Sequence, residues 1–185
     1  MTTDSGLTEA DWSALYLRLE KPLYNAAYRY VWQRQDAQDL VQEAFLQLWQ
    51  RRTALAADTA DRYLWVMTLN LARKRRRWRA LRHFLHLDEV PELPADCASP
   101  EQALVDSEQQ RLLARAIDQL SEKLRSVLLL TEFSEYSYEV VAELLAIPAG
   151  TVASRRHLAL KQLRAVLAEA GAVVAQADAG NGSGR

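Results

Sequence analysis

Apolar residues recur at helical spacing along most of the chain and predict an all-α fold. The clearest example lies between Asp36 and Trp49, where apolar positions follow one another at i, i+1, i+4, i+5, i+8 and i+9. This spacing places them on one broad helix face, with polar side chains opposite. The apolar members are Leu40, Val41, Ala44, Phe45, Leu48 and Trp49. No alternating β-branched run bounded by turn residues indicates a strand.

Start and stop signals divide this pattern into helices. Thr8 with Asp11 resembles a capping pair, and Pro22 suits the first turn of a second helix that ends near Trp32. Asp36 is expected to cap a third helix. A loop is expected over residues 53–60, and further helices at about 61–82, 100–120, 121–133, 138–145 and 150–168.

Prolines and acidic residues indicate two small helical domains joined by a flexible acidic linker. Pro91 and Pro94 stand among acidic residues, a composition typical of a linker. Ser99 and Pro100 then give a strong helix start, and the last residues are small and Gly-rich. The predicted organisation is a domain at 1–86, a linker at 87–99, a second domain at 100–170 and a disordered tail at 171–185.

The total charge conceals opposed blocks. The chain has 23 Lys and Arg against 24 Asp and Glu, a formal net charge of −1, which alone argues against a nucleic-acid partner. Residues 73–82 and 155–164, however, carry basic side chains and no acid, whereas residues 88–110 and 126–154 carry acids and no base. The near-neutral total is therefore a cancellation, and both basic blocks remain candidates for DNA contact.

Residues 137–156 have the pattern of a helix-turn-helix. Val141 and Ala142 give a first helix its inner face, and Pro148 and Gly150 favour a turn. Val152, Ala159, Leu160 and Leu163 can face inward from a second helix. The second helix of this motif enters the DNA major groove, and here it is basic, so we expect it to contact DNA. An ordinary helical hairpin with a solvated basic face is the alternative.

The predicted helix at 61–82 combines aromatic and basic residues. Its basic run at 73–79 covers all sides of the helix, which is too much charge for one solvated face. Tyr63, Trp65 and Trp78 offer rings of the kind that stack on unpaired bases. Contact with opened DNA is therefore expected, although any single ring can belong to the core and the run can be a nonspecific polyanion site. A membrane-surface helix is less favoured, because the run is short and interior.

Three segments, taken in order, resemble one protein family. Residues 36–45, DAQDLVQEAF, resemble the polymerase-binding helix of sigma domain 2. Residues 63–72 with the following arginine run resemble its promoter-melting and −10-reading helix, and residues 138–155 resemble sigma domain 4. By this resemblance the chain is similar to the extracytoplasmic-function (ECF) group of sigma-70 RNA polymerase sigma factors over about residues 10–168.

The resemblance implies a transcription initiation factor that holds no cofactor and is not itself an enzyme. Its first domain would bind the clamp helices of core RNA polymerase through Asp36, Asp39, Leu40, Gln42, Glu43 and Phe45. The same domain would contact and melt the −10 element through Tyr63, Trp65, Asn70, Arg73, Lys74, Arg76 and Arg77, with the loop 53–61 as a pocket for a flipped base. The second domain would sit on the polymerase flap and read the −35 element through Thr151, Ser154, Arg155, Arg156, His157 and Lys161.

The resemblance also implies the partners. These are core RNA polymerase, promoter DNA and an anti-sigma factor, with a monomer as the working form on polymerase. A stand-alone helix-turn-helix regulator that binds duplex DNA without polymerase is the alternative. The helix at 36–49 favours the sigma interpretation, because a simple regulator does not need it.

Other function classes have little support in the sequence. There is no catalytic set and no Gly-rich phosphate loop. His83 and His86 with Cys97 lack a fourth ligand, so no metal site is predicted, and a single cysteine excludes an intramolecular disulfide. With no apolar run of membrane-spanning length and no secretory signal pattern, we expect a cytoplasmic protein without membrane insertion.

Overall fold

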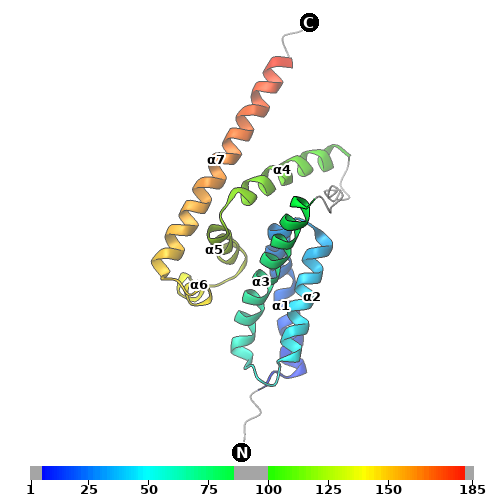
Figure 1. Ribbon diagram of the computed structural model, residues 1–185, viewed down its shortest axis with the longest axis vertical. Helices are drawn as coiled ribbons and strands as arrows, with labels where there is room; N and C mark the ends of the chain where they lie inside the picture. Colours follow the sequence, from blue (N-terminus) through cyan, green and yellow to red (C-terminus); the bar gives the residue numbers. More distant parts are fainter. Residues whose placement is uncertain (1–5, 86–99, 182–185) are drawn as a thin grey trace, which may run out of the picture. The chain divides into compact units, whose positions relative to one another are not determined.

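The structure is a computed structural model of the chain, and it describes the backbone of residues 6–85 and 100–181 (Figure 1). These residues form α-helices and contain no strand, which confirms the predicted all-α fold. The chain groups into two compact units. The first is Met1–Pro94 with Glu132–Tyr136, and the second is Ala95–Thr131 with Ser137–Arg185. The predicted linker at 87–99 lies outside the described residues.

The described part of the first unit is a helical bundle. Its helices α1 (Glu9–Val31), α2 (Arg34–Gln50) and α3 (Ala57–Phe84) pack against one another side by side (Figure 1). The apolar stripe predicted on α2 is its buried face, since Leu40, Val41, Ala44, Phe45 and Leu48 are all in the core. Burying one such large side chain contributes about 1.5–3 kcal/mol, so this shared core accounts for the bundle.

The start of α1 confirms the predicted capping pair. The Thr8 Oγ1 accepts the Asp11 N–H at 3.1 Å, and the Thr8 N–H donates to Asp11 Oδ2 at 3.0 Å. Both bonds satisfy donors that a helix start leaves without intrahelical partners. The hydrogen bonds from Thr8 also lower the pKa of the Asp11 carboxyl.

Pro22 lies inside α1, so the helix boundary predicted at this residue is wrong. A proline in a helix interior removes one backbone donor and crowds the preceding turn, at a cost of about 3 kcal/mol. Leu19 and Leu23, on either side of it, belong to one continuous buried stripe that faces the other two helices. The burial of that stripe outweighs the local penalty, and the helix continues.

Two further boundaries differ from the prediction. The N-cap of α2 is Gln33, so Asp36 stands in the first turn of the helix instead of at its cap. The loop expected over 53–60 is shorter, because α3 already begins at Ala57. The Ala56 carbonyl accepts two N–H groups of the following turn, each at 3.1 Å, which closes the first turn of helix.

The described part of the second unit contains four helices. They are α4 (Pro100–Gln119), α5 (Glu122–Phe133), α6 (Tyr138–Leu145) and α7 (Ala149–Asn181). α7 packs against both α4 and α6. Most of the inward residues predicted for the helix-turn-helix are buried, namely Val141, Ala142, Val152, Ala159 and Leu163, whereas Leu160 is half-buried. This packing of α6 on α7 confirms the predicted motif.

A buried arginine ties α5 to α4, and it was not foreseen from the sequence. Arg125 is fully enclosed, and its guanidinium donates to the carbonyls of Ile117, Asp118 and Leu120 at 2.9–3.1 Å. Carbonyls at a helix C-terminus have no partner within their own helix. Arg125 supplies donors to this end of α4 and thereby fixes where α5 begins.

The turn of the helix-turn-helix is formed by a left-handed alanine. Ala146 has φ 51° and ψ 49°. Its N–H donates to the Glu143 carbonyl at 3.2 Å, and the Ile147 N–H donates to the Ala142 carbonyl at 3.0 Å. These paired bonds define a Schellman C-cap. Gly150 was expected to force the turn, but it lies in the first turn of α7 with no positive φ and open space around its Cα.

α7 is longer than predicted. The helix continues through Asn181, so the disordered tail expected from Gly171 is wrong for residues 171–181, and residues 182–185 lie outside the described ones. The added segment is rich in alanine, the best helix former, and an interior glycine costs only about 1 kcal/mol. No helix in the described ranges has the length and apolarity needed to cross a membrane.

Candidate nucleic-acid interface

The second half of α3 presents a polar and basic face to solvent. Asn70, Lys74 and Arg77 are exposed, and their spacing of four and three residues places them on one helix face. Arg73 shares this face, and its Nη1 donates to Asn70 Oδ1 at 3.5 Å. Cationic side chains can contact phosphates here, and the Asn70 amide can bond a base edge. All four residues were predicted to contact DNA, and their placement permits it.

The opposite face of α3 belongs to the core. Trp65 is only 2% exposed, and Leu64, Leu69 and Ala72 are buried with it. Trp65 was predicted to contact DNA, and the structure corrects this prediction. Its position in the helix turns it inward together with Leu69, and an indole so enclosed offers no face to a base.

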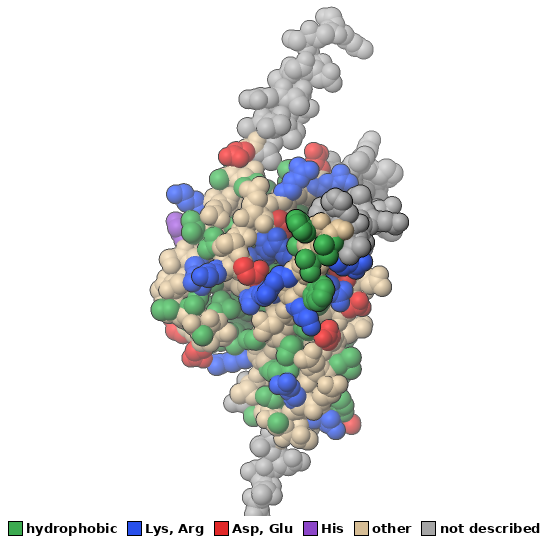
Figure 2. Space-filling model, viewed as in Figure 1, with side chains coloured by type: hydrophobic (Ala, Val, Ile, Leu, Met, Phe, Trp, Pro, Cys, Tyr) green, Lys and Arg blue, Asp and Glu red, His purple; other side chains and the backbone are tan. Residues whose placement is uncertain are grey.

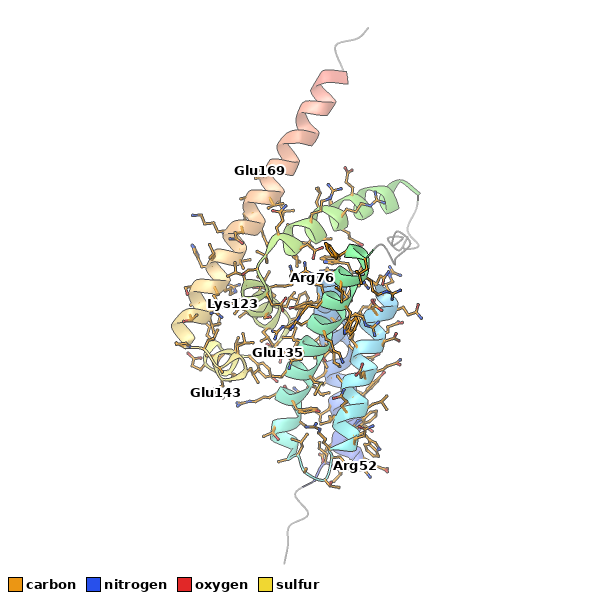
Figure 3. The ribbon with its side chains drawn as sticks, viewed as in Figure 1. Arg52, Arg76, Lys123, Glu135, Glu143 and Glu169 are labelled. Carbon is orange, nitrogen blue, oxygen red and sulfur yellow. The ribbon has the colours of Figure 1, made fainter. Side chains whose placement is uncertain are left out.

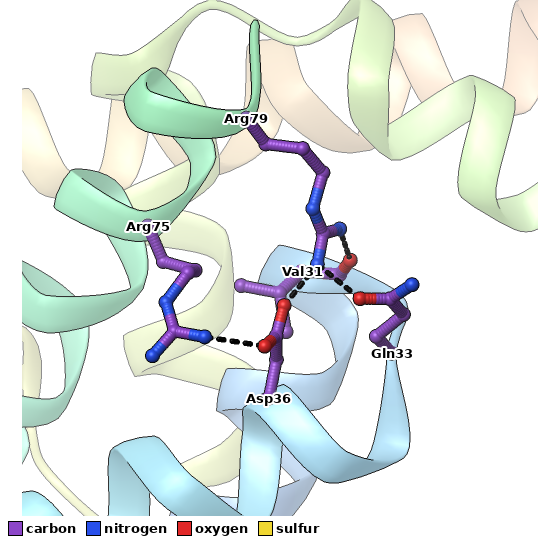
Figure 4. A network of polar contacts seen from close by, with 5 residues as sticks. All are labelled: Val31, Gln33, Asp36, Arg75 and Arg79. Carbon is purple, nitrogen blue, oxygen red and sulfur yellow. Dashed lines mark hydrogen bonds and ion pairs between the residues drawn. The ribbon is translucent and has the colours of Figure 1, made fainter. Parts of the chain in front are cut away.

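Two arginines of the basic run turn inward and join all three helices (Figure 4). Arg79 Nη1 donates to the carbonyl of Val31, the last residue of α1, at 2.6 Å. Its Nη2 donates to the Gln33 side chain at 2.5 Å. Arg75 and Arg79 both form ion pairs with Asp36, whose side chain is 15% exposed. Hydrogen bonds between charged groups are roughly twice as strong as neutral ones, so this cluster fixes the rotation of α3.

This cluster changes the role expected for Asp36. Each carboxylate oxygen of Asp36 is engaged by an arginine, so the residue holds the bundle together, and its contact with polymerase stays a prediction. Leu40 and Phe45, predicted in the same set, are core residues. Arg75 and Arg79 are likewise removed from the cations available to DNA. Arg76 is half-buried and lies between the inner and outer faces of α3.

The exposed face of α2 retains the other predicted polymerase contacts. Asp39, Gln42 and Glu43 are exposed, and Gln47 Nε2 donates to Glu43 Oε1 at 3.1 Å. Leu46 shares this face and is 61% exposed. Leu46 was not among the predicted residues. The sequence does indicate Leu46, because it is an apolar residue outside the predicted buried stripe of this helix.

The turn between α2 and α3 lies at one end of the bundle. Figure 3 shows Arg52 at this end and Arg76 toward the other. The Arg51 guanidinium carbon lies 5.7 Å from the centroid of the Tyr63 ring, and that of Arg52 lies 4.3 Å from the Trp49 ring. Tyr63 is half-buried and sits on the same helix face as the basic residues of α3, two turns earlier. It therefore borders the turn predicted to hold a flipped base.

α7 turns a second polar and basic face outward. Ser154, His157 and Lys161 are exposed, and Thr151 and Arg155 are half-buried. The Ser154 Oγ donates to the Thr151 carbonyl at 3.1 Å, so this hydroxyl is oriented by the helix itself. These residues recur at helical spacing near the N-terminus of α7, where a groove-reading helix places its base contacts.

Arg156 is the remaining predicted DNA contact of α7. It is half-buried and lies one turn from Val152 and Ala159, which are both fully buried. Arg155 is half-buried too and also lies one turn from both, so the two arginines flank the packed face; they differ in that Arg156 makes an interaction within the protein and Arg155 makes none among the described residues. Leu158 is exposed beside Arg155 and was not foreseen. Like Leu46, it is an apolar residue off the buried stripe.

The described residues hold no group of three or more His, Cys, Asp or Glu side chains placed to bind a metal. His86 and Cys97, weighed above as ligands, lie outside the described residues, as does the side chain of His83.

Comparison with known proteins identifies the family. Residues 15–82 match the model of sigma-70 region 2, and residues 110–163 match that of sigma-70 region 4. The ECF RNA polymerase sigma factor SigE of Mycolicibacterium smegmatis is 32% identical over 89% of this chain and 65% of its own length. The RNA polymerase sigma-H factor of Pseudomonas aeruginosa is 31% identical over 84% of this chain and 88% of its own length.

A solved structure supports the fold. It contains the sigma factor RpoE of Bartonella quintana in complex with the anti-sigma factor NepR, and it matches with a TM-score of 0.63 at 23% identity. The match covers 85% of this chain and 96% of that one. The chain belongs to the ECF group of sigma-70 RNA polymerase sigma factors. It is thus a factor for promoter recognition and transcription initiation.

Proposed function

We propose a division of labour between the two units. The first unit binds core polymerase through α2 and opened −10 DNA through α3, and the second unit reads the −35 element through α7. One observation carries the proposal: a single bundle presents both the exposed set on α2 and the basic face of α3. A regulator that only binds duplex DNA needs neither of them beside its helix-turn-helix.

The polymerase-binding face consists of Asp39, Gln42, Glu43 and Leu46. An exposed leucine on the same helix face as two acids and an amide has the composition of a small protein interface, with an apolar anchor and polar neighbours. We assign the polymerase clamp helices as its partner. Asp36, Leu40 and Phe45 support this face from behind, because they fix and fill the bundle beneath it.

The melting face consists of Asn70, Arg73, Lys74 and Arg77, with Tyr63 two turns earlier and Arg76 at its edge. Removing a base from the stack costs a few kcal/mol. Cations that contact the backbone of the opened strand offset this cost, and they do so at any sequence. The turn beside Tyr63 is the proposed pocket for the flipped base.

The −35 reading face consists of Thr151, Ser154, Arg155, His157 and Lys161. An arginine on a groove-facing helix can bond both acceptors of one guanine, which discriminates by about 1–3 kcal/mol. Hydroxyl and lysine side chains more often hold phosphates and set the register. The rest of the second unit is the proposed contact for the polymerase flap.

The remaining proposals concern the cellular setting. The protein acts in the cytoplasm as a monomer on polymerase, supplies no chemistry of its own and holds no cofactor. We also propose an anti-sigma factor as its inhibitor. An inhibitor that covers the polymerase-binding face would keep the protein from polymerase.

A pull-down with core RNA polymerase tests the proposed function. Leu46→Glu replaces the apolar anchor of the polymerase-binding face by a charge and should weaken association at least about tenfold. Leu17→Glu is the matched control, because Leu17 is 83% exposed on α1 of the same bundle and should leave binding unchanged. A protein that binds duplex DNA specifically and never associates with core polymerase would instead be a stand-alone regulator.

A further inference from the structure

The chain segment before α1 is tied to the turn between α2 and α3. The Leu7 N–H donates to the Arg52 carbonyl at 2.7 Å, and Leu7 is only 6% exposed. Figure 1 shows the start of α1 beside this turn, and Figure 2 shows hydrophobic side chains beside Lys and Arg side chains at the same end of the bundle. We call residues 6–8 the N-terminal segment and residues 51–56 the α2–α3 turn.

Gly6 lets the two backbones approach more closely than another residue would allow. A Cβ added at Gly6 would lie 3.0 Å from the Arg52 carbonyl oxygen and 3.1 Å from the Thr53 Cα. Non-bonded carbon atoms attract each other best at about 3.5–4.0 Å. Both neighbours are backbone atoms, which cannot swing aside as the end of a long side chain can. A side chain at position 6 would therefore push the two backbones apart by a few tenths of an ångström.

The N-terminal segment is itself held in place on both sides of its bond to the turn. Thr8 is the N-cap of α1, and its two hydrogen bonds with Asp11 fix the chain at this point. The Leu7 side chain is anchored by its burial in the first unit. A displacement between the two backbones should therefore fall mainly on the α2–α3 turn.

The turn depends on this segment because its own hydrogen bonds are local. The Ala54 N–H donates to the Arg51 carbonyl at 2.9 Å, and the Arg52 Nη1 donates to the Trp49 carbonyl at 3.0 Å. Each of these bonds joins residues three apart, so they shape the turn without connecting it to a distant part of the chain. The bond from Leu7 makes such a connection.

We propose that the N-terminal segment positions the pocket for the flipped base. Gly6 and Leu7 are positioning residues, since they contact the turn and set where its exposed residues Thr53 and Ala54 meet the base. The proposal rests on the proposed melting function, which assigns the pocket to this turn, and it names what fixes the shape of that pocket. A pocket for an extruded base has to fit it closely. A displaced turn should therefore lose discrimination between bases more than overall affinity.

Selection from a random pool of single-stranded DNA tests this inference with the full chain bound to core RNA polymerase. The pool has about eight random positions between fixed arms, and the bound strands are sequenced. The wild type should enrich one base at the position that occupies the pocket. Gly6→Ala should lower that enrichment by about threefold to tenfold, because even small misplacements in a fitted site are costly. The total amount of bound DNA should change less than about twofold, since the cations of α3 act on phosphates of any sequence.

Two further variants support this comparison. Gly150→Ala is the matched control, because a Cβ added there meets nothing within 4 Å, and it should leave the enrichment unchanged. Leu7→Ala weakens the anchor of the N-terminal segment without adding an atom near the turn. It should also lower the enrichment, and it replaces Gly6→Ala if that variant does not fold. Differential scanning calorimetry reports which variants are folded.

The outcomes separate the positioning role from the proposed function. If the wild type enriches a base and the folded variants enrich it equally, the positioning role is overturned while the pocket stands. If Gly6→Ala lowers binding to all sequences alike and keeps the base preference, the role of Gly6 is merely structural and the inference is also overturned. If the wild type enriches no base at any position, the proposed pocket fails, and the positioning role fails with it.

Discussion

At the scale of single residues, the turn of the helix-turn-helix offers the sharpest test. Ala146 holds a left-handed conformation that costs an L-residue with a Cβ about 1–2 kcal/mol. Glycine adopts it freely, although it loses more entropy on folding. We therefore expect Ala146→Gly to raise the free energy of unfolding by about 0.5–1 kcal/mol, measured by urea denaturation followed by circular dichroism.

Gly150 is the natural control for that substitution. It stands in the first turn of α7, and a Cβ added there meets nothing within 4 Å. Gly150→Ala should therefore also stabilise the protein, by up to about 1 kcal/mol, through helix propensity. If Ala146→Gly destabilised the protein while Gly150→Ala did not, the left-handed turn would be contradicted.

At the residue scale, the burial of a side chain was predictable where it depends only on the spacing of apolar residues within one helix. The spacing of Leu40, Ala44 and Leu48 alone predicted their inward face. Ala146 gave no signal, because alanine has no preference for a left-handed turn. Arg125 could not be predicted either, since its partners are carbonyls of another helix. Asp36 was assigned to polymerase because nothing local in the sequence shows that two arginines about forty residues later reach its carboxylate.

At the scale of helices, Asp36 and Asp39 make a discriminating pair on α2. Asp36→Asn removes the charge that Arg75 and Arg79 share, and we expect a loss of about 1–2 kcal/mol in unfolding free energy. This figure is discounted because both arginines are partly exposed. Differential scanning calorimetry measures the loss.

Asp39→Asn is the matched substitution one turn away. Asp39 is exposed, so its change should leave stability within about 0.5 kcal/mol. It should instead weaken the association with core polymerase. The assignment of Asp36 as a structural residue would be refuted if Asp36→Asn left the melting temperature unchanged and impaired only polymerase binding.

On α7, the adjacent arginines give a similar contrast. Both are half-buried, but Arg156 makes an interaction within the protein and Arg155 makes none among the described residues. Arg155→Ala should reduce specific −35 binding by about 1–3 kcal/mol and relax the base preference at one position. Arg156→Ala should act mainly on stability. Electrophoretic mobility shifts against a target promoter and its point variants measure the first effect. If Arg156→Ala instead reduced specific binding and Arg155→Ala reduced only stability, Arg156 would be the arginine in the groove and this prediction would be wrong.

Helix existence was more predictable than helix length. Pro22 looked like a helix start because proline is favoured there, yet the stripe around Leu19 and Leu23 overrode it. The end of α7 looked disordered because Gly171 and its neighbours are small. Small residues are compatible with both states, so composition alone could not decide between them.

At the scale of the whole molecule, the near-zero net charge is an average over oppositely charged regions. It does not predict the charge of the surfaces that contact a partner. The two basic blocks of the sequence lie on α3 and α7, in different units. The basic block of α3 itself has two parts. Arg75 and Arg79 form ion pairs with Asp36. Lys74 and Arg77 are exposed to solvent. The sequence predicted which helices carry the cations. Only the packing of the bundle showed which cations face outward.

The central claim is that this chain makes core polymerase start at defined promoters. The most direct measurement is in vitro transcription of fragmented genomic DNA of the source organism by purified core RNA polymerase, with and without the full chain, followed by mapping of RNA 5′ ends. We predict that adding the chain creates new, discrete start sites that share −35 and −10 elements. We also predict that Leu46→Glu abolishes them while Leu17→Glu does not. Start sites identical with and without the chain would contradict the account.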